Sequence, residues 1–84
     1  MATMTYYVVL PFFRTSDGEL LADELLEVAG PDRARRQAER VARAKGGAVA
    51  FSRTRDAALG NHQDAVILAS FGEVPDDLSE FTRG

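Results

Sequence analysis

The alternation of hydrophobic and polar positions predicts strands in both halves of this chain and one helix between them. Thr5–Arg14 is dense in β-branched and aromatic residues, and it predicts a strand because Pro11 would interrupt a helix. Proline has no backbone N–H, so Pro11 should face an edge, a bulge or the last residues of that strand. Asp17 and Gly18 then favour a chain reversal.

The next segment, Glu19–Ala29, fits two structures. Its alanines and leucines match helical spacing, and their intrinsic preference favours a helix. Leu26 and Val28 instead alternate as in a strand, and the preceding turn favours a returning strand. The residue pattern alone leaves both structures open.

Gly30, Pro31 and Asp32 mark the start of the helix. Glycine is an acceptable cap, proline at the first helical position loses no hydrogen bond, and aspartate stabilises the positive end of the helix dipole. The helix is expected to end at about Lys45, because two glycines follow. Its inward stripe is slim and consists of Ala34, Ala38, Val41, Ala42 and the stem of Lys45.

Two more strands are expected after the helix. Ala48–Thr54 alternates and turns polar at its end, which predicts a strand leaving the core, and Arg55–Gln63 is expected to be a loop. Ala65–Phe71 is apolar on both alternating faces, a pattern typical of a strand covered on both sides. A short turn after it would place Leu78 and Phe81 on one side.

Three stretches in the second half of the chain, together with Gly60, carry a resemblance to a protein family: Gly47–Asp56, Asp64–Leu68 and Phe71–Leu78. They resemble a group of small, uncharacterised bacterial proteins of about this length. The resemblance spans Tyr6–Leu78 and implies that Leu25–Val28 is a second strand. No activity is attached to that family, so the resemblance transfers no functional residue.

These elements predict a two-layer α+β fold in the order β-β-α-β-β, with one helix packed on a four-stranded, mostly antiparallel sheet. The 84 residues should form a single domain, with an ordered core at about 4–74 and a short acidic C-terminal segment at 75–84. One thin helix cannot cover both faces of four strands. We therefore expect a second copy to cover the open face, which makes the protein a homodimer.

Charge is unevenly distributed, although the formal net charge is only −3. Residues 1–31 include one basic and five acidic residues, whereas residues 32–45 include six basic and two acidic ones. The remainder includes three basic and six acidic residues. The basic block coincides with the predicted helix, whose outer face is either simply solvated or a patch for an anionic partner.

We expect a non-enzymatic protein-interaction or regulatory module, and the alternative is nucleic-acid binding through the arginine-rich helix. The sequence pI of about 5.0 argues against nucleic acid. Arg53 and Arg55 share one side of their strand and could instead pair with Asp56 and Glu73 of this chain. The candidate interaction surface comprises Arg33, Arg36, Arg40, Arg43, Arg53, Arg55, Asp76 and Asp77.

Residues that could support catalysis or metal binding are few. There is no cysteine, so disulfides, thiolate metal sites and cysteine catalysis are excluded. His62 stands near Asp56 and Asp64, yet no second histidine or calcium-loop pattern accompanies them. Ser52 lacks the glycine-framed turn that exposes a hydrolase nucleophile. We expect no enzyme activity, no catalytic residue, no metal and no cofactor.

Two features bear on location. No lysine or arginine precedes the apolar run Tyr6–Phe13, so this run does not have the form of a signal peptide. No stretch approaches the roughly 20 apolar residues that cross a bilayer. We therefore expect a cytoplasmic protein that does not contact a membrane.

Overall fold

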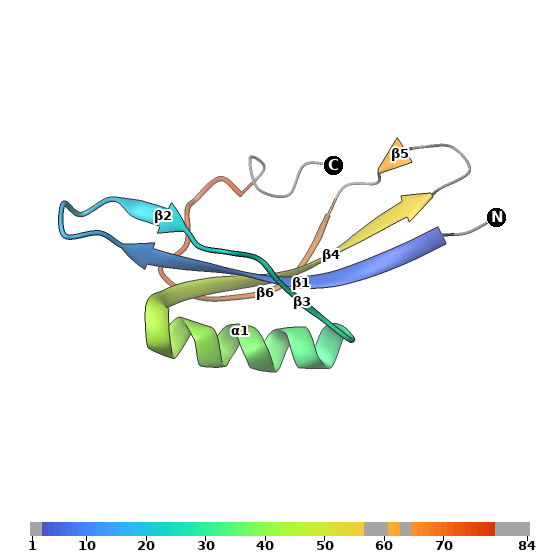
Figure 1. The fold of residues 1–84 in the computed structure, drawn as a ribbon, viewed down its shortest axis with the longest axis horizontal. Coiled ribbons are helices and arrows are strands. Elements are labelled where there is room, and N and C mark those ends of the chain that lie inside the picture. Colours follow the sequence, from blue (N-terminus) through green and yellow to red (C-terminus); the bar gives the residue numbers. More distant parts are fainter. Residues whose placement is uncertain (1–2, 57–60, 63–64, 79–84) are drawn as a thin grey trace.

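The computed structural model describes residues 3–56, 61–62 and 65–78 (Figure 1). In this part of the chain, six strands form one sheet and a single helix packs against it. The elements are β1 (Thr3–Arg14), β2 (Leu20–Ala22), β3 (Leu26–Val28), α1 (Pro31–Lys45), β4 (Gly46–Asp56), β5 (Asn61–His62) and β6 (Val66–Gly72). Each strand pair is antiparallel. The expected α+β fold, with a helix packed on an antiparallel sheet, is confirmed.

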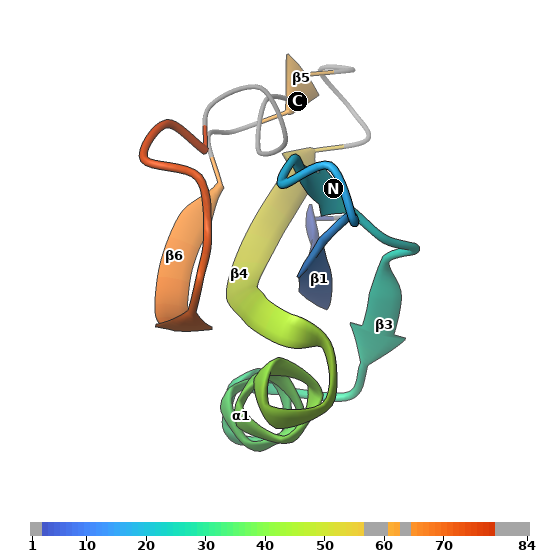
Figure 2. The same ribbon diagram turned by 90° about the vertical axis from the view of Figure 1, so that its left-hand side faces the viewer.

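β1 and β4 are the long central strands of the sheet. They pair from Thr3 opposite Asp56 to Phe13 opposite Gly46. β2 and β3 share the outer edge of β1, and β5 and β6 share the outer edge of β4, so the sheet is four strands wide. α1 contacts β1, β4 and β6 on one face of this sheet (Figure 2).

The segment that fitted two structures is extended. It forms β2 and β3 with a break at 23–25, so the helical alternative is wrong and the strand implied for Leu25–Val28 is confirmed. The break lies opposite Pro11, whose carbonyl oxygen accepts a hydrogen bond of 2.9 Å from the N–H of Asp23. Because Pro11 has no N–H to donate toward this side of β1, the ladder is interrupted there, and Pro11 faces the gap between the two short edge strands.

α1 begins and ends where the sequence predicts. Gly30 has an extended backbone, and Pro31 follows it in the first turn of the helix. At the other end, Gly46 has a φ of 123°, and its N–H donates to the carbonyl oxygen of Ala42. Such a φ favours glycine because a side chain would be strained there. The chain can therefore turn directly from α1 into β4.

The inward face of α1 consists of small side chains, as expected. Ala34 and Ala38 are fully buried in one cluster with Val9, Ala48 and Ala50 of the sheet. Alanine on both sides of this contact lets the helix approach the strands closely. The helix is thereby fixed on the sheet, and its opposite side faces solvent.

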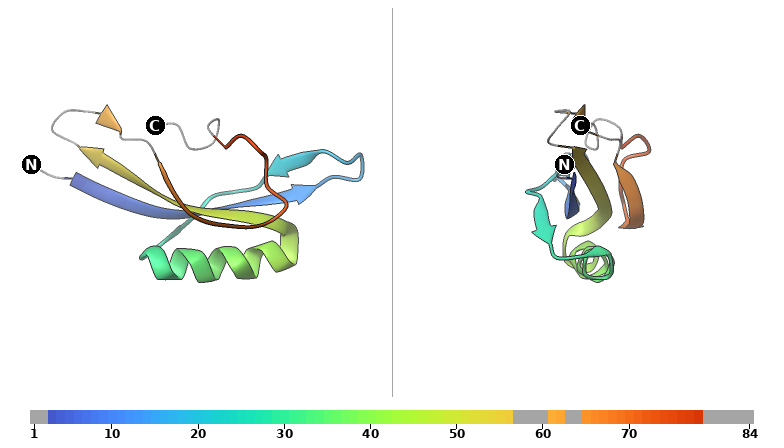
Figure 3. Two further views of the ribbon diagram at one scale, coloured as in Figure 1. Left: turned by 180° about the vertical axis from the view of Figure 1, so that it is seen from behind. Right: turned by 90° about the vertical axis from the view of Figure 1, so that its right-hand side faces the viewer.

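The face of the sheet that does not carry α1 is also buried at its centre. It holds a second cluster, in which each side chain is at most 9 % exposed: Val8, Leu10, Phe12, Val49 and Phe51. The segment after β6 returns along this face (Figures 1 and 3), and Val74 and Leu78 pack against the cluster. The premise that one chain leaves this face open is therefore wrong for its centre. The homodimer itself stays a prediction, and Phe81 lies outside the described residues.

β6 differs from the strand covered on both sides that its apolar run predicts. Val66 and Ile67 are 59 % and 44 % exposed, respectively. The pairing of β6 with β4 is irregular, because Ala50 lies opposite Ala69 whereas Phe51 lies opposite Ile67. β6 is an edge strand among the described elements, so its outer side lacks a covering neighbour there. An apolar run cannot by itself distinguish an edge strand from a central one.

The loop predicted for Arg55–Gln63 also needs a correction. Arg55 and Asp56 belong to β4, and Asn61–His62 pair back onto them as β5. Charged residues at the end of β4 misled the sequence prediction, because an exposed strand end tolerates polar residues as readily as a loop does. The arginines of β4 therefore project from a strand of defined register.

Candidate functional site

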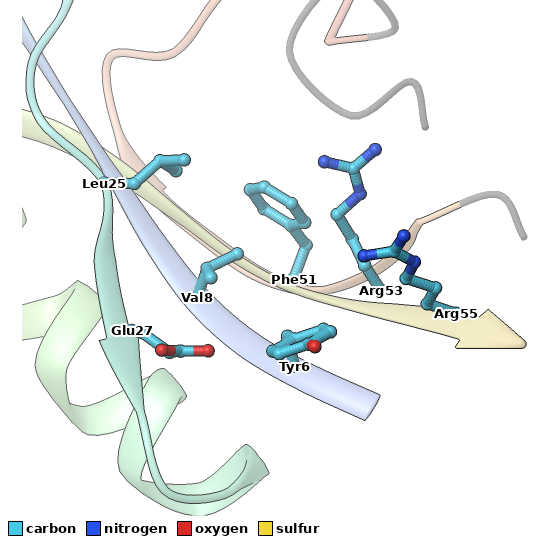
Figure 4. Close-up of a pocket in the computed structure, with 7 residues that line it drawn as sticks. All are labelled: Tyr6, Val8, Leu25, Glu27, Phe51, Arg53 and Arg55. Carbon is cyan, nitrogen blue, oxygen red and sulfur yellow. The ribbon is translucent and has the colours of Figure 1, made fainter. Parts of the chain in front are cut away.

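The structure divides the predicted interaction surface into three regions. One region lies on α1 and comprises Arg33, Arg36, Arg40 and Arg43. Arg53 and Arg55 follow Phe51 at alternating positions of β4, so they point to the face that does not carry α1 (Figure 4). Asp76 and Asp77 lie in the segment after β6. Because the sheet separates the arginines of α1 from those of β4, the eight residues do not form one surface.

The outward side of α1 carries three arginines that we call the arginine stripe: Arg33, Arg36 and Arg40. Their spacings of three and four residues place them along one side of the helix. All three are exposed. Together with Gln37 they line a polar hollow of about 350 Å³. The buried alanines on the other side of α1 hold this stripe toward solvent.

Other arginines of α1 are paired within the helix. Arg35 Nη1 lies 3.0 Å from Asp32 Oδ1, and Arg43 Nη2 lies 3.3 Å from Glu39 Oε2. Arg43, a predicted site residue, is therefore partly neutralised. The arginine stripe takes part in none of the four ion pairs between described residues. Its like charges repel one another slightly, which an external anion would relieve.

Arg53 and Arg55 line a second hollow, which we call the sheet-face pocket (Figure 4). It lies on the face opposite α1 and has a volume of about 220 Å³. Its lining comprises Tyr6, Val8, Leu25, Glu27, Phe51, Arg53 and Arg55. The register places Tyr6 opposite Arg53 and Val8 opposite Phe51. Glu27 of β3 and Leu25, which immediately precedes β3, line the other side.

The sequence did not identify Tyr6, Leu25 and Glu27 as neighbours of the β4 arginines. A signal was present, because Tyr6 and Val8 are two residues apart and share one face of β1, and Leu25 and Glu27 have the same spacing. Their meeting depends on the pairing of β1 with both β3 and β4, which no local pattern specifies.

Two acidic residues after β6, Glu73 and Asp76, line neither hollow. Glu73 forms an ion pair with Arg14, with 2.9 Å between Oε2 and Nη2, so it is engaged at the far end of β1. Asp76 is exposed. Only the backbone of Asp56 and His62 is described, and Asp64 lies outside the described residues, so the metal hypothesis at that loop stays untested.

Two absences hold for the part of the chain that the structure describes. No group of three or more His, Cys, Asp or Glu side chains there is arranged to hold a metal ion. The helix of this part is also too short and too polar to cross a membrane.

Comparisons with known proteins leave the family open. No family model matches the chain, and searches of curated proteins and of solved structures likewise find no match. The resemblance to small bacterial proteins therefore stays a prediction, and the function has to be inferred from the two hollows.

Proposed function

We propose that this protein is a non-enzymatic interaction module that binds an acidic protein partner through the arginine stripe of α1. One observation carries the proposal: three exposed arginines share one side of α1 and form none of the ion pairs between described residues. The helix is held by Ala34 and Ala38, so the stripe is presented on a rigid element. Three guanidinium groups that line one hollow suit the carboxylates of an acidic segment.

A protein partner fits this stripe better than nucleic acid does. The chain carries a net charge of −3, and a duplex would meet general repulsion outside α1. Nucleic-acid binders neutralise several phosphates along an extended track, whereas this stripe offers three arginines on one helix. Nucleic acid remains the competing outcome of the experiment.

Charge reversal tests the proposal directly. The double variant Arg36→Glu, Arg40→Glu reverses two of the three charges of the stripe without touching the buried face of α1. Arg55→Glu on the other face of the sheet is the matched control. Proteins captured from the host are identified by mass spectrometry, and each binary interaction with the purified partner is then measured by calorimetry. The double variant should lose at least about tenfold in affinity, which corresponds to about 1.4 kcal/mol. Its melting temperature should stay near that of the wild type.

Two results would overturn the proposal. One is an acidic partner that binds the double variant as tightly as the wild type. The other is binding of single- or double-stranded oligonucleotides with an affinity that falls steeply with salt, which would assign the stripe to nucleic acid.

The proposal includes self-association through β6. Val66 and Ile67 are large, apolar and exposed on an edge strand, and such edges pair readily with another strand. Gel filtration with light scattering should give about twice the chain mass of 9.1 kDa, and Ile67→Lys should reduce it to that of one chain. A monomeric wild type at micromolar concentration would contradict this part alone.

A further inference from the structure

We infer that the sheet-face pocket is a binding site for a small organic acid, an apolar body of about the size of one ring that carries a carboxylate or phosphate group. This site is independent of the arginine stripe, because the sheet and α1 separate the two. The inference rests on the shape of the pocket and on the arrangement of charge around it.

The floor of the pocket is apolar and rigid. Phe51 is only 1 % exposed and Val8 only 9 % exposed, and both belong to the cluster at the centre of this face. Tyr6 extends this floor along β1 and presents its ring beside Phe51 (Figure 4). Small-molecule sites are typically concave and mostly apolar, with a few polar groups that orient the ligand.

Charge is graded across the pocket. The guanidinium groups of Arg53 and Arg55 stand together at one end, and the carboxylate of Glu27 stands at the other (Figure 4). An anionic group is therefore favoured beside Arg55, the exposed one of the two arginines, and disfavoured beside Glu27, which sets the direction in which a ligand would lie. Planar guanidinium groups match carboxylate and phosphate oxygens in particular.

Leu25 marks where the apolar part of a ligand would lie. Its side chain is 52 % exposed at the rim, although it is large and apolar. A ring placed over Val8 and Tyr6 would cover Leu25 and remove its surface from water. The volume of about 220 Å³ is below the range of about 300–1,000 Å³ that holds drug-sized ligands, so the body should be a single ring or a short branched chain.

Titration of the full-length chain, labelled with nitrogen-15, tests this site by NMR. The probes are benzoate, phenyl phosphate, the neutral benzyl alcohol and the cationic benzylamine. At least one anion should shift the amide signals of Tyr6, Phe51 and Arg53 in a saturable way, and the comparison of benzoate with phenyl phosphate identifies the favoured group. Benzyl alcohol should bind about fivefold more weakly or worse, as expected for loss of an exposed charge pair worth up to about 1 kcal/mol.

Three variants locate the binding. Arg55→Gln should weaken binding of the anion by about two- to fivefold, since Arg55 is exposed and its charge is partly screened. Glu27→Gln should strengthen it by about twofold, because a repelling carboxylate is removed. Arg36→Gln, on the other side of the molecule, is the matched control and should leave binding unchanged.

Several results would overturn the site. Equal binding of benzyl alcohol and benzoate would show that the charge of the ligand does not matter. If Arg55→Gln and Arg36→Gln weakened anion binding equally, the effect would come from the net charge of the protein and not from the sheet-face pocket. Shifts confined to α1, or no saturable shift with either anion, would also reject it. The charge-reversed stripe variant should still bind the anion, so failure here and failure of the proposed function can be told apart.

Discussion

Arg14 at the end of β1 holds Glu73, the residue that follows β6, through two hydrogen bonds to one carboxylate oxygen. Its Nε and Nη2 donate to Glu73 Oε2 at 3.1 and 2.9 Å, and its Nη1 donates to the carbonyl oxygen of Gly18 at 2.6 Å. One guanidinium group thus joins the first turn to the start of the segment that covers the second face of the sheet.

Replacing either partner should destabilise the fold modestly. The two side chains are 49 % and 57 % exposed, and exposed pairs contribute up to about 1 kcal/mol. We expect Arg14→Gln to lower the free energy of unfolding by about 1 kcal/mol, and Glu73→Gln by less, because only Arg14 also binds Gly18. Urea denaturation of both single variants and the double variant measures the coupling. Fully additive losses would contradict an interaction between the two side chains.

Gly47 is expected to tolerate no side chain. A Cβ at this position would collide with the backbone of Glu73, where neither partner is a flexible side chain. Gly47→Ala should therefore cost about 1–3 kcal/mol, the range for an overpacked core. Gly30→Ala is the control, because no atom lies within 4 Å of a Cβ there, and it should cost less than about 1 kcal/mol, since alanine is only a poorer helix cap than glycine. Chemical denaturation should give Gly47→Ala a clearly lower free energy of unfolding than Gly30→Ala. Similar values for the two variants would refute the close approach of Gly47 to the backbone of Glu73.

The alanine contact beneath α1 should resist larger side chains. Ala38 is fully buried between the helix and the sheet, so Ala38→Leu should displace the helix and cost about 1–3 kcal/mol. Ala44→Leu is a matched control on the same helix, because Ala44 is exposed, and its effect should stay within about 0.5 kcal/mol. Thermal unfolding followed by circular dichroism compares the two variants. Equal melting temperatures would mean that the helix does not pack as closely as described.

Asp23 should contribute to stability in a pH-dependent way. The backbone N–H of Glu24, at 2.8 Å, and the ammonium of Lys45, at 3.0 Å, hold the pKa of this carboxyl below its ordinary value of 3.8. A lowered pKa in the folded state means that the stabilisation is complete above the ordinary value and is lost as the pH falls through the lower one.

Melting temperatures across this acid range check the prediction. The wild type should lose more stability on acidification than Asp23→Asn, which has no proton to bind at this position. The loss of stability of Lys45→Met should lie between these two, because the hydrogen bond from the N–H of Glu24 to Asp23 remains. Identical acid profiles for the wild type and Asp23→Asn would show that the pKa of Asp23 is not lowered in the folded protein.

Much of the fold could be predicted because several of its signals are local. Pro31 and Asp32 favour a helix start whatever the rest of the chain does, and Pro11 interrupts any ladder toward which it points. The exposure of Val66 and Ile67 on β6 could not be predicted, because the same apolar residues also occur in central strands that are covered on both sides. Of the candidate site, the basic side of α1 followed from residue spacing, but its separation from Arg53 and Arg55 did not.

The residue pattern alone determined the limits of α1, its alanine-lined inner side, its basic outer side and the extended form of β1 and β4. These properties depend on neighbours a few residues away, which is the range over which capping, periodicity and backbone preference act. Only the tertiary structure decided that Tyr6 lies opposite Arg53, that Leu78 packs over the second face and that β6 stays at an edge. Those relationships join residues far apart in the chain, and their energies come from register and packing that no single segment contains.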